Sequence, residues 1–255
     1  MQNKRLFYIL PCFNEELNLN KLLNDFYKFY KSRDYYVQIV IINDGSTDKS
    51  LNVINEFKKK KISKKIKIIT INHKKNLGFG ETLRDGFNYC ITKGLVNDLI
   101  ISMDCDNSHT VELSHKMAIK IISNNCDIVI ASRYKKNSKI KGLAKNRIFL
   151  SFVAAALYKL FFPIENIKDY TSGFRAFRLG IIKNACKKNK NFFSEKGFSA
   201  SADIILKLYK YKNQIKFEEV PINLRYDLKL GQSKMKVVKT IFLNLKLIFN
   251  RKLFN

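Results

Sequence analysis

Short apolar runs alternate with segments of helical periodicity through most of the chain. The mainly apolar runs lie at residues 6–10, 37–42, 66–71, 99–103 and 127–131, and a further predicted strand at 215–220 carries Lys and Glu between its apolar residues. Between them, residues 16–31, 49–60, 81–93, 111–124 and 200–211 place apolar side chains at the three- and four-residue spacing of a helix. Buried parallel strands are typically continuous apolar runs. The alternation therefore predicts an α/β fold with a mostly parallel central sheet and helices on both faces.

For two later segments, the sequence does not decide between burial in the domain and contact with a membrane. Residues 147–162 are nearly all apolar, apart from Ser151 and Lys159, and they fall short of the about 18 to 20 residues that cross a bilayer. This segment is either a buried helix or an interfacial helix. Residues 237–254 form a basic amphipathic pattern, which suits either an anionic membrane surface or packing on the domain. We therefore divide the chain into residues 1–236 and a C-terminal helix at 237–255.

Polar or glycine-bearing segments follow several of the predicted strands. They lie at residues 11–16, 43–48, 76–80 and 104–109. Loops at the carboxyl ends of parallel strands converge on one crevice, and a nucleotide site is the natural expectation there. No GxGxxG follows the first strand and no GxxxxGK[ST] occurs. The sequence therefore supports neither the dinucleotide nor the P-loop mode of binding.

Two aspartates one residue apart, Asp104 and Asp106, end the apolar run that starts at Leu99. Held at a strand end, two carboxylates can share a divalent cation with a diphosphate, because Mg²⁺ takes oxygen ligands and is usually completed by substrate phosphates. The alternative is an ordinary turn, since Asp, Asn and Ser cluster in turns. The pair is the candidate metal site.

The net charge is +27, from 48 Lys and Arg against 21 Asp and Glu. Such a surface attracts polyanions: nucleic acid, anionic lipid headgroups or phosphorylated substrates. Neither a ribonucleoprotein motif nor helix-turn-helix patterning is present, so we expect no nucleic-acid partner. The acids at the strand ends would also repel nucleic-acid phosphates.

The five cysteines are scattered and form no CxxC or CxxH pair. They indicate neither a zinc site nor a disulfide framework, and a reducing cytosol fits them best. The N-terminal apolar run is too short for a signal peptide and is followed at once by Glu15 and Glu16. We interpret it as the first strand.

The polar segments, taken in order, resemble family-2 glycosyltransferases of the GT-A (Rossmann-like) fold. The motifs are Pro11-Cys-Phe-Asn-Glu15, Asn43-Asp-Gly-Ser46, Asp104-Cys-Asp106 and Ser132-Arg-Tyr134. The second half resembles the branch of dolichyl-phosphate mannosyltransferases and bacterial polyprenyl-phosphate glycosyltransferases. Its motifs are Ser172-Gly-Phe-Arg175, Glu219-Val-Pro-Ile222, and Arg225 with Gly231-Gln-Ser-Lys234. The resemblance covers residues 5–236, which would form the catalytic domain.

The resemblance implies a role for each matching residue. The donor, a nucleoside diphosphate sugar, would meet Pro11, Asn14, Glu15, Asn43, Asp44, Gly78 and Cys105. Asp104 and Asp106 would hold Mg²⁺ or Mn²⁺ and act in catalysis together with Arg133. The phosphates of donor and acceptor would meet Arg133, Arg147, Ser172, Arg175, Arg225, Ser233 and Lys234.

The implied reaction is inverting transfer of a sugar from a GDP-mannose or UDP-hexose type of donor to a polyprenyl or dolichyl phosphate. Asn43 stands where an Asp is usual, Ser108 where Gln is frequent and Cys105 where Ala is common, so the sugar and the nucleotide remain open. Asp203 replaces a frequent Glu.

The alternative reaction is transfer to a glycan hydroxyl in envelope or capsular polysaccharide synthesis. It would need a carboxylate base, for which Asp169 and Asp203 are the candidates. We expect a cytoplasmic protein in peripheral contact with a membrane, and we leave its oligomeric state open.

Overall fold

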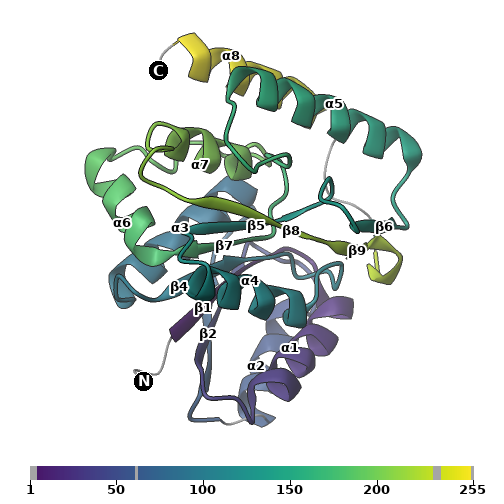
Figure 1. Ribbon diagram of the computed structural model, residues 1–255. Helices are drawn as coiled ribbons and strands as arrows, with labels where there is room; N and C mark the ends of the chain where they lie inside the picture. The colour runs from purple at the N-terminus through teal and green to yellow at the C-terminus, as the bar shows by residue number, and fades with distance from the viewer. Residues whose placement is uncertain (1–4, 61–62, 232–236, 254–255) are drawn as a thin grey trace.

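The computed structural model describes residues 5–60, 63–231 and 237–253 (Figure 1). The strands are β1 (Arg5–Cys12), β2 (Tyr36–Asn43), β3 (Ile66–Asn72), β4 (Leu99–Ser102), β5 (Ile128–Ser132), β6 (Lys139–Lys141), β7 (Arg175–Arg178), β8 (Phe217–Pro221) and β9 (Asn223–Arg225). The α-helices are α1 (Glu16–Tyr30), α2 (Ser50–Lys60), α3 (Phe79–Lys93), α4 (Val111–Ser123), α5 (Lys145–Phe161), α6 (Leu179–Lys188), α7 (Ala200–Tyr209) and α8 (Val237–Leu253). A 3₁₀ helix, η1, spans Tyr226–Leu228.

Seven strands form one sheet in the order β3-β2-β1-β4-β7-β5-β8. All neighbours in it are parallel except at β7, which runs antiparallel to both β4 and β5. The predicted α/β class and the mostly parallel sheet are confirmed. The sequence analysis missed β7, α6 and the small parallel sheet of β6 and β9.

Alternate residues of the central strands face two separate cores. Tyr8 of β1 packs with Phe26 of α1 in a core that α1, α2 and α4 cover. Phe7, one residue earlier, packs with Phe87 of α3 on the other face, beneath α3, α5, α6, α7 and α8. This period of two is the geometry of a strand buried on both sides, and it confirms helices on both faces (Figure 1).

Helices α5 and α8 lie side by side on the outside of the second layer (Figure 1). The Tyr158 hydroxyl of α5 donates to Asn244 Oδ1 of α8 across 2.7 Å. Helix α5 buries Ala155 and Tyr158 but exposes Phe149 (65%) and Phe152 (59%). Within the described residues, α5 is therefore buried on one side and exposed on the other, so the buried-helix alternative for residues 147–162 holds for one side only.

The C-terminal helix packs on the domain, as one of its two expected environments required. Leu247 and Ile248 of α8 are buried in the second core, and Arg251 pairs with Asp203 of α7 at 2.7 Å. Phe242 and Phe249, on the opposite side, are 67% and 65% exposed. The helix packs on the domain with one face and leaves the other open. The boundary expected after residue 236 adjoins residues 232–236, which lie outside the described residues.

Within residues 5–60, 63–231 and 237–253, none of the helices has both the length and the apolar character needed to cross a membrane.

Candidate active site

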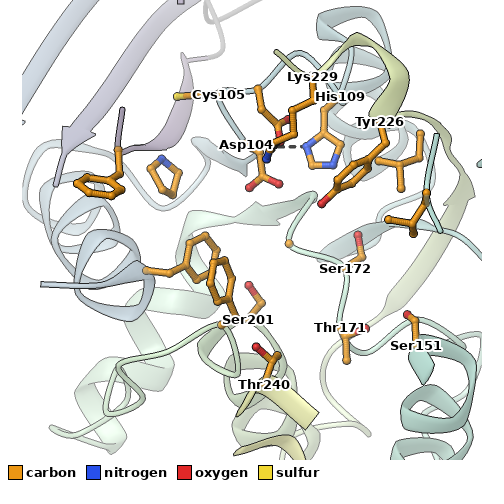
Figure 2. Close-up of a pocket in the computed structure, with 18 of the residues that line it drawn as sticks. Asp104, Cys105, His109, Ser151, Thr171, Ser172, Ser201, Tyr226, Lys229 and Thr240 are labelled. Carbon is orange, nitrogen blue, oxygen red and sulfur yellow. Dashed lines mark hydrogen bonds and ion pairs between the residues drawn. The ribbon is translucent and has the colours of Figure 1, made fainter. Parts of the chain in front are cut away.

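A cavity of about 470 Å³ opens at the sheet edge where β1, β2, β4 and β5 end. The loop that precedes β7 reaches the same edge, because β7 runs in the opposite direction. Figure 2 shows how side chains from both halves of the chain point into this space. Sequence-predicted residues that line the cavity are Pro11, Glu15, Asp44, Gly78, Asp104, Cys105, Asp106, Arg133, Arg147 and Ser172. The loops expected to converge therefore do so.

Asp44 organises the turn on one wall of the cavity. Its Oδ1 accepts from the backbone N–H of Leu77 at 2.8 Å, and its Oδ2 accepts from that of Gly78 at 2.9 Å. His73 contacts Asp44 through Nδ1 at 2.7 Å and Asp85 through Nε2 at 3.0 Å. Burial disfavours protonation of His73, but the hydrogen bonds with both carboxylates outweigh it and raise the pKa of the imidazole. His73 thus holds the buried Asp44 in place through this hydrogen bond.

Asn14 and Asn43 support the cavity from behind and do not line it. Asn14 has a left-handed backbone conformation (φ 52°), and its side-chain Oδ1 accepts a hydrogen bond from the Thr47 N–H at 2.8 Å. Asn43 Oδ1 accepts from the Ser46 N–H at 3.3 Å. Both side chains fasten the polar loops at the strand ends to one another.

Asp104 and Asp106 lie together at the end of β4. Burial and the charge of Asp106 raise the pKa of Asp104 to about 7. Burial also opposes ionisation of Asp106, but Lys229 at 2.7 Å holds the pKa of that carboxyl below its usual range. Asp106 Oδ1 accepts from both the N–H and the hydroxyl of Ser108, at 3.1 and 2.5 Å. The pair thus combines Asp106, which is hydrogen-bonded to Lys229 and Ser108, with Asp104, whose raised pKa reflects burial and the charge of Asp106.

The donor set of this pair fits a hard divalent cation. The Asp104 carboxylate points into the cavity (Figure 2) and accepts no hydrogen bond from residues 5–60, 63–231 or 237–253. Those same ranges contain no group of three or more His, Cys, Asp or Glu side chains placed to hold a metal. A cation here would take its remaining oxygen ligands from substrate phosphates and water, as Mg²⁺ usually does.

His109 stands beside the aspartates and was not predicted as a site residue. Its Nδ1 accepts from the Asp104 N–H at 3.2 Å, and its ring stacks on Phe174 with centroids 4.4 Å apart. Burial lowers the pKa of His109 to about 4, so the imidazole is neutral and presents Nε2–H as a donor. The only sequence signal was its place at the end of the acidic loop.

Arg133 forms the opposite wall together with Asp169. Its Nε and Nη2 donate to the two carboxylate oxygens of Asp169 at 2.8 and 2.6 Å, and Nη2 also donates to the Thr171 hydroxyl at 2.6 Å. Burial opposes the charge of Asp169, but Arg133 outweighs it and lowers the pKa of that carboxyl. These bonds fix the orientation of the guanidinium, and the Arg133 side chain lines the cavity.

Hydroxyl groups line the part of the cavity that extends towards α5 and α8 (Figure 2). They belong to Ser151, Thr171, Ser172, Ser201 and Thr240. Arg147 of α5 lines the same region. Hydroxyls and arginines together suit the oxygens of a phosphate or a sugar.

The structure does not bring the other predicted phosphate-binding residues into the cavity. Arg175 is 1% exposed, and its guanidinium donates to the carbonyl oxygens of Ser201 and Tyr170. Arg225 lies outside the lining and is paired with Asp227 at 2.8 Å. Arg175 thus joins β7 to α7 and its neighbouring loop, and Arg225 stabilises its own turn. Ser233 and Lys234 lie outside the described residues.

Lys229 and Tyr226, which sequence reasoning did not single out, line the cavity. They belong to the segment that follows Arg225, in which residues 226–228 form η1. The cationic character of this segment was the available signal, but the sequence does not indicate which cation reaches the aspartates.

This fold and site define a class of enzyme: a sheet with paired aspartates after β4, facing an arginine across a cavity, is the arrangement of GT-A glycosyltransferases. The chain belongs to glycosyl transferase family 2, whose family model matches residues 8–185. The resemblance drawn from the motifs is therefore confirmed, and the protein is a glycosyltransferase by family.

Curated relatives narrow the similarity to enzymes of lipid-linked sugars. A dolichol-phosphate mannosyltransferase of Pyrococcus furiosus is 30% identical over 242 residues, which are 94% of this chain and 62% of the relative. A UDP-N-acetylglucosamine–dolichyl-phosphate N-acetylglucosaminyltransferase of Methanococcus voltae is 24% identical over 238 residues, covering 89% of this chain and 88% of the relative. The chain thus spans about three fifths of the length of the first of these relatives and most of the second.

Solved structures agree on the fold. Glucosyl-3-phosphoglycerate synthase from Mycobacterium tuberculosis, in complex with Mn²⁺, UDP and glucosyl-3-phosphoglycerate, has a TM-score of 0.68. The two chains are 13% identical, and the match covers 98% of this chain and 80% of the synthase. At this identity the similarity confirms the GT-A architecture.

Proposed function

We propose that the protein transfers a hexosyl group from a nucleoside diphosphate sugar to a polyprenyl or dolichyl phosphate. The observation that carries the proposal is the continuity of the cavity. It runs from Asp44 and the paired aspartates to the inner sides of α5 and α8, where it is lined by Ser151 and Asn244. The outer sides of those two helices expose aromatic residues. One space thus joins an acidic region to a pair of helices that offers an apolar surface.

The acidic wall is the donor half in this proposal. Carboxylates such as Glu15 and Asp44 suit it because they accept hydrogen bonds from ribose hydroxyls and base N–H groups. Asp104 and Asp106 would hold Mg²⁺ or Mn²⁺. A bound divalent cation would offset the charge that develops on the leaving nucleoside diphosphate.

The arginine wall is the acceptor half. Arg133 and Arg147 would position the lipid phosphate, whose oxygen attacks the anomeric carbon from the side opposite the leaving group. A phosphate monoester has a second pKa of about 6, so it is largely dianionic at neutral pH. It needs orientation and charge compensation, and no protein base has to remove a proton.

The geometry disfavours transfer to a glycan hydroxyl. The candidate base Asp169 is fully buried and bound through both oxygens by Arg133. The other candidate, Asp203, pairs with Lys207 at 2.8 Å and with Arg251 at 2.7 Å, and it lies outside the cavity. Both carboxylates stabilise the fold in this structure.

Peripheral membrane contact forms part of the proposal. The outer apolar surface of α5 and α8, defined by Phe149, Phe152, Leu160, Phe242 and Phe249, is at least 59% exposed at each residue. Aromatic side chains on paired helices, in a chain of net charge +27, suit insertion at an anionic headgroup layer. Contact through the cytoplasmic leaflet would bring the lipid phosphate to the cavity.

A vesicle flotation assay tests this contact. Wild-type protein should float with vesicles that contain anionic phospholipid, and a Phe149→Ser/Phe242→Ser variant should not. Leu17→Ser removes an equally exposed (63%) apolar residue on α1, and it should float like the wild type. If the double variant floats unchanged, the outer surface of α5 and α8 is not the site of contact.

The decisive experiment for the reaction incubates purified protein with Mn²⁺, a short polyprenyl phosphate and a panel of GDP- and UDP-sugars. Thin-layer chromatography should reveal a glycosylated lipid with one donor, and EDTA should abolish it. Donor hydrolysis without a lipid product would refute the lipid acceptor and favour a hydroxyl acceptor.

A further inference from the structure

Lys229 forms an ion pair with one carboxylate oxygen of Asp106, a residue of the candidate metal site. Its Nζ lies 2.7 Å from Asp106 Oδ2, and the two side chains are 12% and 4% exposed. Figure 2 shows Lys229 next to Asp104 at the wall of the cavity. The other oxygen of Asp106, Oδ1, is already engaged by Ser108. The oxygen that remains for a divalent cation is therefore the one that the ammonium group occupies.

The segment that carries Lys229 is fastened to the donor half of the cavity. The Asn18 side chain of α1 donates to the Leu230 carbonyl oxygen at 3.0 Å and accepts from the Leu230 N–H at 3.2 Å. The same Asn18 amide donates to Glu15 Oε2 at 2.7 Å, and the Asn107 amide donates to the Asn18 carbonyl oxygen at 3.1 Å. One buried asparagine thus links a donor-wall carboxylate, the aspartate loop and the Lys229 segment.

We propose that Lys229 is a tethered cation that competes with the divalent ion for Asp106 and transfers to the donor's diphosphate when that ion binds. This inference rests on the proposed function. The competition follows from geometry, because one oxygen cannot keep a 2.7 Å ion pair and also ligate a second cation at full strength. An ammonium that is only 12% exposed and is displaced from Asp106 would be stabilised by another anion. The donor's phosphates would provide it in the same cavity.

The exchange predicts cooperative binding of metal and nucleotide. Without a nucleotide, metal binding must break the Lys229–Asp106 pair, and the ammonium loses its hydrogen-bonded carboxylate. With the diphosphate present, the ammonium gains a new partner and that penalty falls. The two ligands should therefore strengthen each other's binding, with equal coupling in both directions.

Mn²⁺ binding tests the proposal without any turnover. The free ion is measured by electron paramagnetic resonance at pH 8, with and without UDP or GDP, for wild type and for Lys229→Met. We expect the variant to bind Mn²⁺ about tenfold more tightly in the absence of nucleotide, because Asp106 has lost its compensating charge. It should also lose most of the enhancement that the nucleotide gives to the wild type.

Matched variants keep the test sharp. Lys229→Arg retains a cation and should keep the nucleotide enhancement, and Lys136→Met removes an exposed lysine and should change neither affinity. Circular dichroism verifies that each variant is folded. Equal Mn²⁺ affinity in Lys229→Met and wild type, or weaker affinity in the variant, would overturn the proposal while leaving the metal site intact. An Asp106→Asn variant that binds Mn²⁺ like the wild type would overturn the metal site as well.

Discussion

Replacement of Asp169 by Asn tests the contact that builds the arginine wall of the cavity. The Asp169 carboxylate is fully buried and accepts the Nε, Nη2 and backbone N–H donors of Arg133, as well as the N–H of Ser172. An Asn side chain keeps the size but loses the charge, and its amide group turns a donor towards the guanidinium. Arg133, whose side chain is only 16% exposed, then loses its counter-ion.

The Asp169→Asn substitution should lower the free energy of unfolding substantially. Removal of one partner from a buried ion pair typically destabilises a protein by about 3 to 5 kcal/mol, because the remaining charge is uncompensated. For a chain of this size, each kcal/mol lowers the melting temperature by about 2 to 4 °C. The Asp169→Asn variant should therefore melt about 6 to 20 °C below the wild type. Activity should fall as well, because Arg133 loses the partner that orients its guanidinium.

Thermal unfolding followed by circular dichroism measures this effect, with Asp25→Asn on the exposed side of α1 as the control. A double-mutant cycle with Arg133→Gln isolates the pair, and a coupling energy under about 0.5 kcal/mol would refute the reasoning. The pH dependence has a definite sign. Arg133 keeps the folded pKa of Asp169 below the unfolded value of about 3.9, so the wild type's advantage is full above that pH. The advantage should vanish as the pH falls through the depressed pKa.

Three further changes have defined outcomes. Asp106→Asn should abolish sugar transfer at saturating metal, and near-normal rates in that variant would contradict a metal–diphosphate role for this carboxylate. His73→Gln should remove a stabilising contribution that is present below the unfolded pKa of about 6.5 and lost as the pH rises through the raised folded pKa; chemical denaturation at pH 6 and pH 9 measures it, and equal losses at both would refute it. Gly80→Ala should cost about 1 to 3 kcal/mol by overpacking, since an added Cβ would meet the Glu195 carbonyl oxygen; Gly197→Ala, which meets only ordinary contacts, should be tolerated in the same melts.

Strand patterning explains why much of the fold was predictable. The runs at residues 6–10, 37–42 and 66–71 became β1, β2 and β3 with shifts of two residues or fewer at each end. β1 and β2 are buried on both faces and so are nearly all apolar, whereas the edge strand β3 is only partly buried and is still recognisable from its isoleucines. β7 was not predicted as a strand, because its four residues begin and end with arginine. The burial of Arg175 depends on carbonyl oxygens of α7 and of the preceding loop, and a local pattern does not report such partners.

The site residues also fall into those that the sequence could predict and those that it could not. Asp104, Asp106 and Arg133 follow strands directly, so the topology of the sheet places them at one edge. Lys229 lies 123 residues from Asp106, and its position depends on the side-chain clamp at Asn18. A cationic segment far along the chain indicates charge, but the sequence does not show which carboxylate that charge meets. Arg225 was predicted to bind phosphate but does not line the cavity, because its guanidinium is paired with Asp227 two residues away.

The reversed strand β7 changes how a sequence of this architecture has to be scanned for ligand-binding positions. Along the parallel strands, the chain reaches the cavity as it leaves a strand, but at β7 it reaches the cavity before it enters. The segment after β7 begins α6 at Leu179, whose N–H donates to the carbonyl oxygen of Asp98 in front of β4, at the opposite rim. Variation at that distant rim can adjust stability while the ligand-facing rim stays unchanged, so the two rims are free to diverge independently.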